Sequence, residues 1–278
     1  MRIGFITCVR LGESCLEELI NLGADLVYLG TLHDDLAKRK SGRIYLDDFA
    51  ARHELRLQKF RNINDPDALQ GIREAELDWL YVIGWSQIAR REVLSTPSRG
   101  VIGMHPTLLP QGRGRASIPW AIIKGLDRTG VTLFQLDEGM DTGPILGQVE
   151  VPITPNETST TLYEKVAEAH RVLIRQTYAG VADGTIEGTP QNEDVATEWP
   201  GRRPEDGLLL PETMTEQDVD RYVRALTHPY PGAFIRLNAR QNLRIWCGKM
   251  GWHADGHPIA TSDGWFTATH YDLEDRAD

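Results

Sequence analysis

The chain has 278 residues, of which 40 are acidic and 30 basic, so its formal net charge is −10. This length accommodates one large domain or two modest ones. The acidic balance disfavours a nucleic-acid partner, because Lys and Arg that neutralise phosphates supply most non-specific affinity, although a local basic patch is compatible with it. The three scattered cysteines, Cys8, Cys15 and Cys247, are typical of reduced thiols.

Membrane and export signals are not evident in the sequence. No run approaches the roughly 20 apolar residues that span a bilayer. The N-terminus lacks the apolar core and the small-residue cleavage site of a signal peptide. We therefore expect a cytoplasmic protein without membrane association.

The first third of the chain predicts a parallel sheet. Residues 2–8 and 26–30 are apolar runs, and residues 13–21 between them carry Leu and Ile at helical spacing. A β-α-β start of this kind is typical of α/β proteins. Further helices are expected at 46–52 and 66–76, and strands at 55–60 and 78–83. The first turn lacks Gly-x-Gly-x-x-Gly, so no dinucleotide fingerprint is present.

Two polar side chains in the middle of the chain follow predicted strands. An apolar run at 101–104 ends at His105-Pro106, and proline favours an extended conformation for the residue before it. A second predicted strand, 131–136, leads into a Gly-rich segment that contains Asp141. Ligands bind at strand ends in open α/β sheets, so both side chains are candidate site residues.

The remaining elements predict a helix-rich segment and then a β-rich tail. We expect a helix at 116–124, a strand at 147–153, helices at 158–183 and 215–226, and strands at 233–237, 243–247 and 264–268. Thr161-x-x-Glu164 resembles a capping box, and Thr215 followed by Asp218 is typical of a helix start. His170 lies beside an apolar helical stripe and is interpreted as structural.

The polar, Pro- and Gly-rich segment 191–210 is the candidate linker. It separates an α/β domain, 1–190, from a small β-rich domain, 211–278. His253 and His257 with Cys247 nearby raise the question of a metal. A tetrahedral zinc set is not evident there and Pro258 favours a turn, so we expect no metal.

Three ordered motifs resemble the formyltransferases that use 10-formyltetrahydrofolate. They are His105-Pro-Thr-Leu-Leu-Pro with Arg113-Gly, then Thr-Gly-Val-Thr at 129–132, then the Asp-x-Gly turn that begins at Asp141. The tail adds Gly-Arg-Arg-Pro-Glu-Asp-Gly at 201–207 and a Pro- and Gly-containing segment at 223–234, as in the branches that act on methionyl-tRNA and on amino sugars. The matches cover most of the chain. The resemblance implies a Rossmann-like, mostly parallel sheet followed by a small, reduced OB-like β-rich domain.

The resemblance also implies site residues. His105 and Asp141 would be catalytic. The residues expected to bind the folate are Ile83, Gly84, Trp85, Ser86, Gln87, Leu136, Asp137, Glu138, Gly139 and Met140. Those expected to bind the acceptor are Gly103, Met104, Pro106, Thr107, Arg113 and Arg115. Two guanidiniums on a Gly-rich loop suit an anion, although structural ion pairs across the loop are an alternative.

One position departs from the family pattern, since Gly103 stands where the family has Asn two residues before the His. Loss of one oxyanion donor typically lowers turnover by about 100- to 1000-fold. Candidates to replace it are Ser86, Gln87, Thr107 and Gln148.

The sequence predicts an N-formyltransferase that uses 10-formyltetrahydrofolate as formyl donor. The expected acceptor is a primary amine of a small molecule, with a nucleotide-linked amino sugar as first choice. Methionyl-tRNA is the second candidate acceptor within the same enzyme class, and an amino-acid amine or hydroxylamine is the third. A folate-binding protein without turnover is a further alternative because of Gly103. A homodimer is left open.

Overall fold

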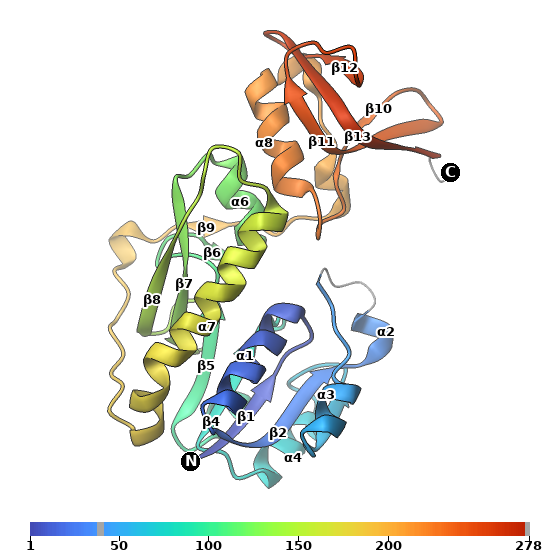
Figure 1. The fold of residues 1–278 in the computed structure, drawn as a ribbon. Coiled ribbons are helices and arrows are strands. Elements are labelled where there is room, and N and C mark those ends of the chain that lie inside the picture. The colour runs from blue at the N-terminus through green and yellow to red at the C-terminus, as the bar shows by residue number, and fades with distance from the viewer. Residues whose placement is uncertain (38–41, 276–278) are drawn as a thin grey trace. The chain divides into compact units, whose positions relative to one another are not determined.

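A seven-stranded, mostly parallel sheet forms the larger part of the protein. The computed structural model describes residues 1–37 and 42–275. The sheet has the order β3-β2-β1-β4-β5-β7-β8 (Figure 1). Its strands are β1 (Arg2–Ile6), β2 (Asp25–Leu32), β3 (Leu57–Phe60), β4 (Trp79–Ile83), β5 (Gly100–His105), β7 (Arg128–Gln135) and β8 (Ile145–Pro152).

The central strands of the sheet are parallel and are buried on both faces. β1 pairs in parallel with β2 and β4, and β4 pairs in parallel with β5. Every residue of β4 and of β5 is buried, which explains why the sequence shows continuous apolar runs there rather than alternation. β7 pairs antiparallel with β5. The predicted α/β fold class is therefore confirmed, with an antiparallel edge on a parallel sheet.

Helices connect and cover these strands. They are α1 (Arg10–Asn21), α2 (Asp34–Ala37), α3 (Asp47–Arg52), α4 (Pro66–Glu74), α5 (Arg91–Leu94), α6 (Ser117–Ile123) and α7 (Ser159–Asp183). α1 and α7 lie side by side (Figure 1), and Arg175 of α7 donates to Glu18 of α1 at 2.7 Å. No helix in the described part of the chain is long and apolar enough to cross a membrane.

The tail folds into a four-stranded antiparallel sheet with one helix. The helix is α8 (Glu216–Leu226), and the sheet has the order β10-β11-β13-β12. Its strands are β10 (Ala233–Arg236), β11 (Gln241–Met250), β12 (His257–Ala260) and β13 (Trp265–Asp275). Thr215 and Asp218 form the predicted capping box of α8. β12 was not predicted from the sequence, because Pro258 favours a turn; the strand lies at the sheet edge, where proline is tolerated.

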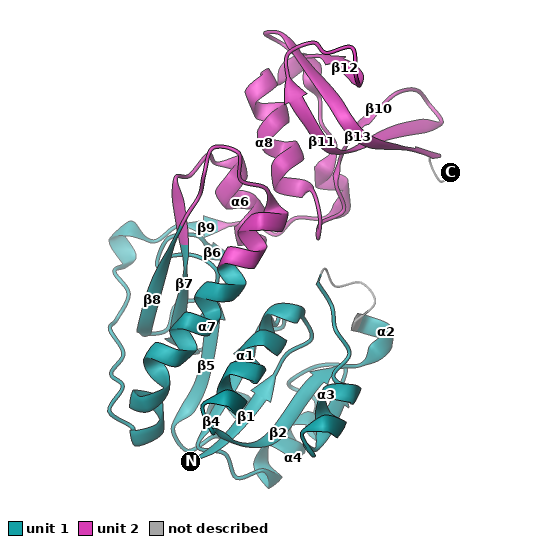
Figure 2. Cartoon of the chain, in the orientation of Figure 1, with its two compact units in different colours: residues 1–114, 130–151, 166–198 teal, residues 115–129, 152–165, 199–278 magenta. Residues whose placement is uncertain are grey.

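The chain divides into two compact units that are discontinuous in sequence (Figure 2). One unit comprises residues 1–114, 130–151 and 166–198, and the other comprises 115–129, 152–165 and 199–278. Two short strands, β6 (Arg113–Gly114) and β9 (Glu198–Trp199), pair with each other. The division into domains at 1–190, 191–210 and 211–278 stays a prediction.

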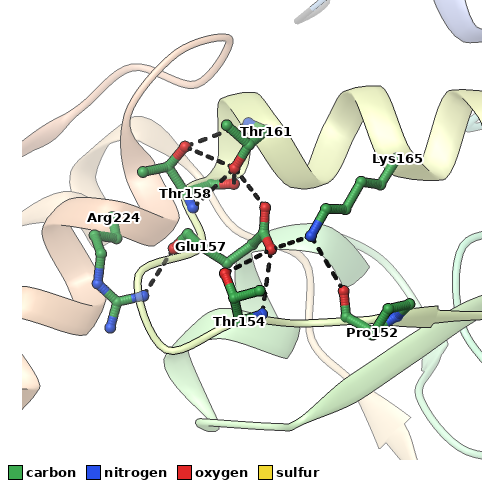
Figure 3. Close-up of polar contacts among 7 residues, drawn as sticks. All are labelled: Pro152, Thr154, Glu157, Thr158, Thr161, Lys165 and Arg224. Atoms are coloured by element: carbon green, nitrogen blue, oxygen red, sulfur yellow. Dashed lines mark hydrogen bonds and ion pairs between the residues drawn. The ribbon is translucent and has the colours of Figure 1, made fainter.

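The start of α7 is held by a buried carboxylate, Glu157 (Figure 3). It accepts hydrogen bonds from Thr161 at 2.5 Å and from Lys165 at 2.5 Å. Thr158 precedes the helix, and its hydroxyl accepts from the Thr161 backbone N–H at 3.3 Å. The predicted capping box Thr161-x-x-Glu164 is therefore wrong, since Thr161 lies inside the helix and Thr158 is the capping residue.

Candidate active site

His105 is the last residue of β5 and is buried. Its Nε2 lies 2.8 Å from the Gly112 carbonyl oxygen, which can only accept, so Nε2 carries the hydrogen. Its Nδ1 faces a carboxylate oxygen of Asp141 at 3.6 Å, longer than a hydrogen bond. Both ring nitrogens therefore face hydrogen-bond acceptors.

Asp141 is held in place by backbone and side-chain contacts. Its Oδ2 accepts from the Gly114 N–H at 2.8 Å, and its carbonyl oxygen accepts from the Gln191 side chain at 2.8 Å. Its φ angle is +57°, in the left-handed region that Asp tolerates better than most residues. Non-glycine residues persist in this region where surrounding contacts fix them, which is frequent at functional sites.

The His105 and Asp141 side chains come close together because the loop after β7 folds back, which the order of the strands alone did not predict. β7 is antiparallel to β5, with His105 opposite Thr132 and Ile102 opposite Gln135. The end of β7 consequently lies beside the start of β5, away from His105. The loop after β7 folds back, so that Asp141 returns to within 3.6 Å of the imidazole.

Gly103 lies in β5 under the side chain of Leu136. A Cβ atom built at Gly103 would be 2.6 Å from Leu136 Cδ2 and 3.3 Å from Phe134 Cε1. Leu136 therefore fills the volume that the family's Asn side chain would need. Where the family has Asn, this protein therefore has Gly103 together with the apolar side chain of Leu136.

The residues proposed to replace the missing donor have different surroundings. Both N–H groups of Gln148 are used, by the Leu109 carbonyl at 2.9 Å and by Thr132 at 2.8 Å. Gln87 bonds the backbone of Arg61 and Ile63, which ties its loop to the segment after β3. The Thr107 hydroxyl is buried and has no partner among the described residues.

The predicted folate-binding residues lie on two loops and the strand ends beside them. After β4, Ile83 is buried, Gly84 has a φ of +65°, and Ser86 is exposed. The Trp85 ring packs edge-on against Phe60, and its Nε1 is buried without a partner in the part of the chain that the structure describes. After β7, residues 137–140 are exposed, and Asp137 accepts from the Gly139 N–H and from Thr142.

The predicted acceptor-binding residues differ in exposure. Met104 and Thr107 are buried, and Pro106 is half-buried. The Arg113 side chain is 5% exposed and makes a bidentate pair with Glu193, at 2.6 and 2.8 Å. Arg115 is exposed. The structure thus places Arg113 in the ion pair that was the alternative interpretation, and its binding of a ligand anion stays a prediction.

Three residues that hold the His105 and Asp141 side chains in place were not predicted from the sequence as site residues. Gly112, Gly114 and Gln191 position the His105 and Asp141 side chains through the contacts above, and in the sequence Gly112 and Gly114 belong to the motif Gly-Arg-Gly-Arg.

His170 is fully buried, and its Nδ1 lies 2.7 Å from the Val166 carbonyl oxygen. Burial lowers the pKa of His170 to about 4, with a smaller contribution from the nearby His105. Within residues 1–37 and 42–275, no three His, Cys, Asp or Glu side chains are grouped to hold a metal.

Comparison with known proteins identifies the family. The family model for formyl transferases matches residues 13–177. A methionyl-tRNA formyltransferase from Agathobacter rectalis is 30% identical over 252 residues, which cover 90% of this chain and 80% of that protein. The chain belongs to the formyl transferase family.

Solved structures support the same fold. A sugar N-formyltransferase from Shewanella sp FDAARGOS_354 has a TM-score of 0.72 at 19% identity, covering 89% of this chain and 97% of that one. HypX from Aquifex aeolicus in complex with tetrahydrofolic acid has a TM-score of 0.71 at 19% identity, covering 98% of this chain. The present chain corresponds to 44% of the HypX chain, less than half of its length.

Family membership confirms three predictions made from the sequence. The protein is a formyltransferase of the 10-formyltetrahydrofolate-dependent class, its formyl donor is that of the family, and its fold is a mostly parallel sheet followed by a small β-rich domain. The acceptor is not fixed by family membership, because relatives named for methionyl-tRNA and for sugars are both similar to this chain.

Proposed function

We propose that the protein transfers the formyl group of 10-formyltetrahydrofolate to a primary amine of a nucleotide-linked amino sugar, with His105 and Asp141 as catalytic residues. The observation that carries the residue assignment is the His105–Asp141 pair. An imidazole 3.6 Å from a carboxylate, buried at the end of β5, is a charge arrangement suited to acyl transfer.

The pair would act on the two charges that the reaction creates. The folate supplies the formyl carbon, whose carbonyl oxygen becomes an oxyanion when the neutral amine attacks. His105 would pass a proton to the departing nitrogen through Nδ1, because Nε2 is engaged with the Gly112 carbonyl oxygen. Asp141 would accept the proton that the amine loses. The Gly114 N–H keeps the Asp141 carboxylate oriented.

The residues of the two predicted folate loops fit a flat heterocycle. The buried Trp85 Nε1 without a partner offers a hydrogen bond to such a ring, and a buried donor of this kind costs free energy until it is paired. Leu136 and Met140 provide apolar surface, and Met140 is 40% exposed. An apolar wall with a few polar groups is the usual composition of a small-molecule site.

Two observations support the choice of acceptor: the net charge of the chain and its similarity to a sugar N-formyltransferase. A net charge of −10 disfavours binding of a large polyanion such as tRNA. The Shewanella structure, named as a sugar N-formyltransferase, matches 97% of its own length to this chain. Methionyl-tRNA is the second candidate, favoured by the relative from Agathobacter rectalis.

The test is a turnover assay with several acceptors. The protein is mixed with 10-formyltetrahydrofolate and a panel of nucleotide-linked amino sugars, with methionyl-tRNA in a parallel series, and release of tetrahydrofolate is followed. We expect turnover with a member of the sugar panel. Turnover with methionyl-tRNA alone would refute the acceptor assignment. Folate binding without turnover on any acceptor would favour the alternative that the protein binds folate and has no catalytic activity.

A further inference from the structure

Residues 189–197 form a bridging segment that contacts both loops of the candidate site. At one end, Thr189 exchanges two backbone hydrogen bonds of 2.8 Å with Ile145, just past the loop after β7. Near the other end, the Thr197 carbonyl oxygen accepts from the Arg113 backbone N–H at 2.9 Å, in the segment that follows β5. The bridging segment and both loops belong to one compact unit, drawn in teal in Figure 2.

The Gln191 side chain joins the two loops directly. Its Oε1 accepts from Nε and Nη2 of Arg113 at 3.1 and 2.8 Å. Its Nε2 donates to the carbonyl oxygens of Asp141 and Gly143, both at 2.8 Å. An amide accepts at its oxygen and donates at its nitrogen, so this orientation satisfies the guanidinium and both carbonyls at once. One side chain therefore fixes the turn that carries the Asp141 carboxylate relative to Arg113.

Glu193 fixes the guanidinium that Gln191 contacts. It accepts from Nη2 and Nη1 of Arg113 at 2.6 and 2.8 Å, so the bridging segment engages all three guanidinium nitrogens. The pKa of Arg113 is raised mainly by its hydrogen bonds to Glu193 and to a smaller extent by the charge of Asp141. Glu193 and Asp141 thus compete for one cation, and the pairing with Glu193 leaves the Asp141 carboxylate beside His105.

Burial makes this competition consequential. The Arg113 side chain is 5% exposed, whereas the Glu193 side chain is 68% exposed. A buried charge that loses its partner is left uncompensated, which is strongly unfavourable. Without the Glu193 carboxylate, the guanidinium would therefore draw the Asp141 carboxylate toward itself and away from the imidazole.

We propose that Gln191 and Glu193 are positioning residues for formyl transfer, which act through Arg113 to hold the Asp141 carboxylate beside His105. The inference rests on the proposed function, because His105 and Asp141 are its catalytic residues. It gives Arg113 a role in the geometry of the site rather than in binding of the acceptor.

Steady-state kinetics of the full chain distinguish positioning from binding. Gln191→Leu and Glu193→Gln should each lower kcat about tenfold or more while the KM values for folate and acceptor stay nearly unchanged, because a misplaced catalytic group costs up to about 100-fold. The exposed position of Glu193 favours folding of its variants, and Glu193→Asp keeps the charge and should recover part of the lost kcat. Gln176→Leu and Glu187→Gln make the same changes at exposed positions of the same unit and should match the wild type.

A second measurement does not depend on turnover. The imidazole nitrogen resonances of His105, identified by NMR from their loss in His105→Asn, report the charge beside Nδ1. Asp141→Asn should shift these resonances because it removes that charge. Gln191→Leu and Glu193→Gln should also shift them, and the two control variants should not.

Two results would overturn the positioning role. One is wild-type kcat with unshifted His105 resonances in both Gln191→Leu and Glu193→Gln, which would leave the proposed function intact if the wild type formylates an amino-sugar nucleotide. The other is a raised KM for the acceptor with unchanged kcat, which would assign Arg113 to acceptor binding. Shifted resonances in a protein that formylates no amino-sugar nucleotide would support the positioning role and reject the proposed function.

Discussion

Gly103 and Leu136 should behave as a coupled pair in stability measurements. A Cβ atom at position 103 would lie 2.6 Å from Leu136 Cδ2 and 3.2 Å from its Cγ. Gly103→Ala must therefore displace Leu136, and overpacking of this kind costs about 1–3 kcal/mol. Leu136→Ala removes a half-buried side chain and should cost about 1–2 kcal/mol. In the double variant the overpacking is absent, so the two effects should fall short of their sum by about 1–2 kcal/mol.

The assay is equilibrium urea unfolding of the wild type, both single variants and the double variant. Leu69 provides a matched control, because it is another half-buried leucine that packs against the same core cluster. Gly103→Ala combined with Leu69→Ala should be additive, since Leu69 is not among the nearest neighbours of a Cβ at position 103. Additive free energies for Gly103→Ala and Leu136→Ala would refute the argument that Leu136 occupies the space of the missing Asn side chain.

Three further predictions concern catalysis and stability. His105→Asn and Asp141→Asn should each lower kcat about 100-fold or more while the urea midpoint changes little, because Asn also tolerates the left-handed conformation at position 141. His170, whose pKa burial lowers to about 4, stays neutral in the folded protein while the unfolded chain takes up a proton near pH 6.5. Stability should therefore fall by about 3 kcal/mol between pH 7 and pH 4 through this residue, and the loss should be absent in His170→Gln. Glu157→Gln removes a buried carboxylate that pairs with Lys165 and should lower the free energy of unfolding by about 3 kcal/mol at pH 7.

Each of these has an outcome that would contradict it. Normal turnover of His105→Asn would exclude the imidazole from catalysis. An unchanged pH dependence in His170→Gln would mean that other groups cause the acid sensitivity. Burial raises the pKa of Glu157, but the hydrogen bonds from Lys165, Thr161 and Thr154 outweigh it and the net shift is downward. Its stabilising effect should thus be present above about pH 4.3 and lost at lower pH, so equal stability of Glu157→Gln and the wild type at pH 7 would contradict the assigned contacts.

The strands of the central sheet could be predicted because burial on both faces leaves a simple signal. β4 and β5 are apolar along their whole length, and the proline after His105 marks the end of β5. β12 could not be predicted, because an edge strand tolerates Pro258 and so resembles a turn in sequence. β11 and β13 extend beyond their apolar cores, since long-range pairing between them continues through polar residues.

The sequence predicted some residues of the candidate site, but it could not predict the contacts that depend on tertiary structure. His105 and Asp141 stood out because each follows an apolar run, yet the return of the loop after β7 depends on an antiparallel pairing that periodicity does not encode. The contact between Gly103 and Leu136 is likewise invisible in sequence, because the residues are far apart along the chain. Arg113 carried an anion-binding motif, while its bidentate partner Glu193 lies in the segment interpreted as a linker.

The most direct test of the central claim is to follow a labelled formyl carbon. The wild type and His105→Asn are incubated with labelled 10-formyltetrahydrofolate, a nucleotide-linked amino sugar and methionyl-tRNA together, and the labelled product is identified. The account predicts label on the sugar amine with the wild type and about 100-fold less with His105→Asn. Label on methionyl-tRNA, or equal labelling by both proteins, would contradict it.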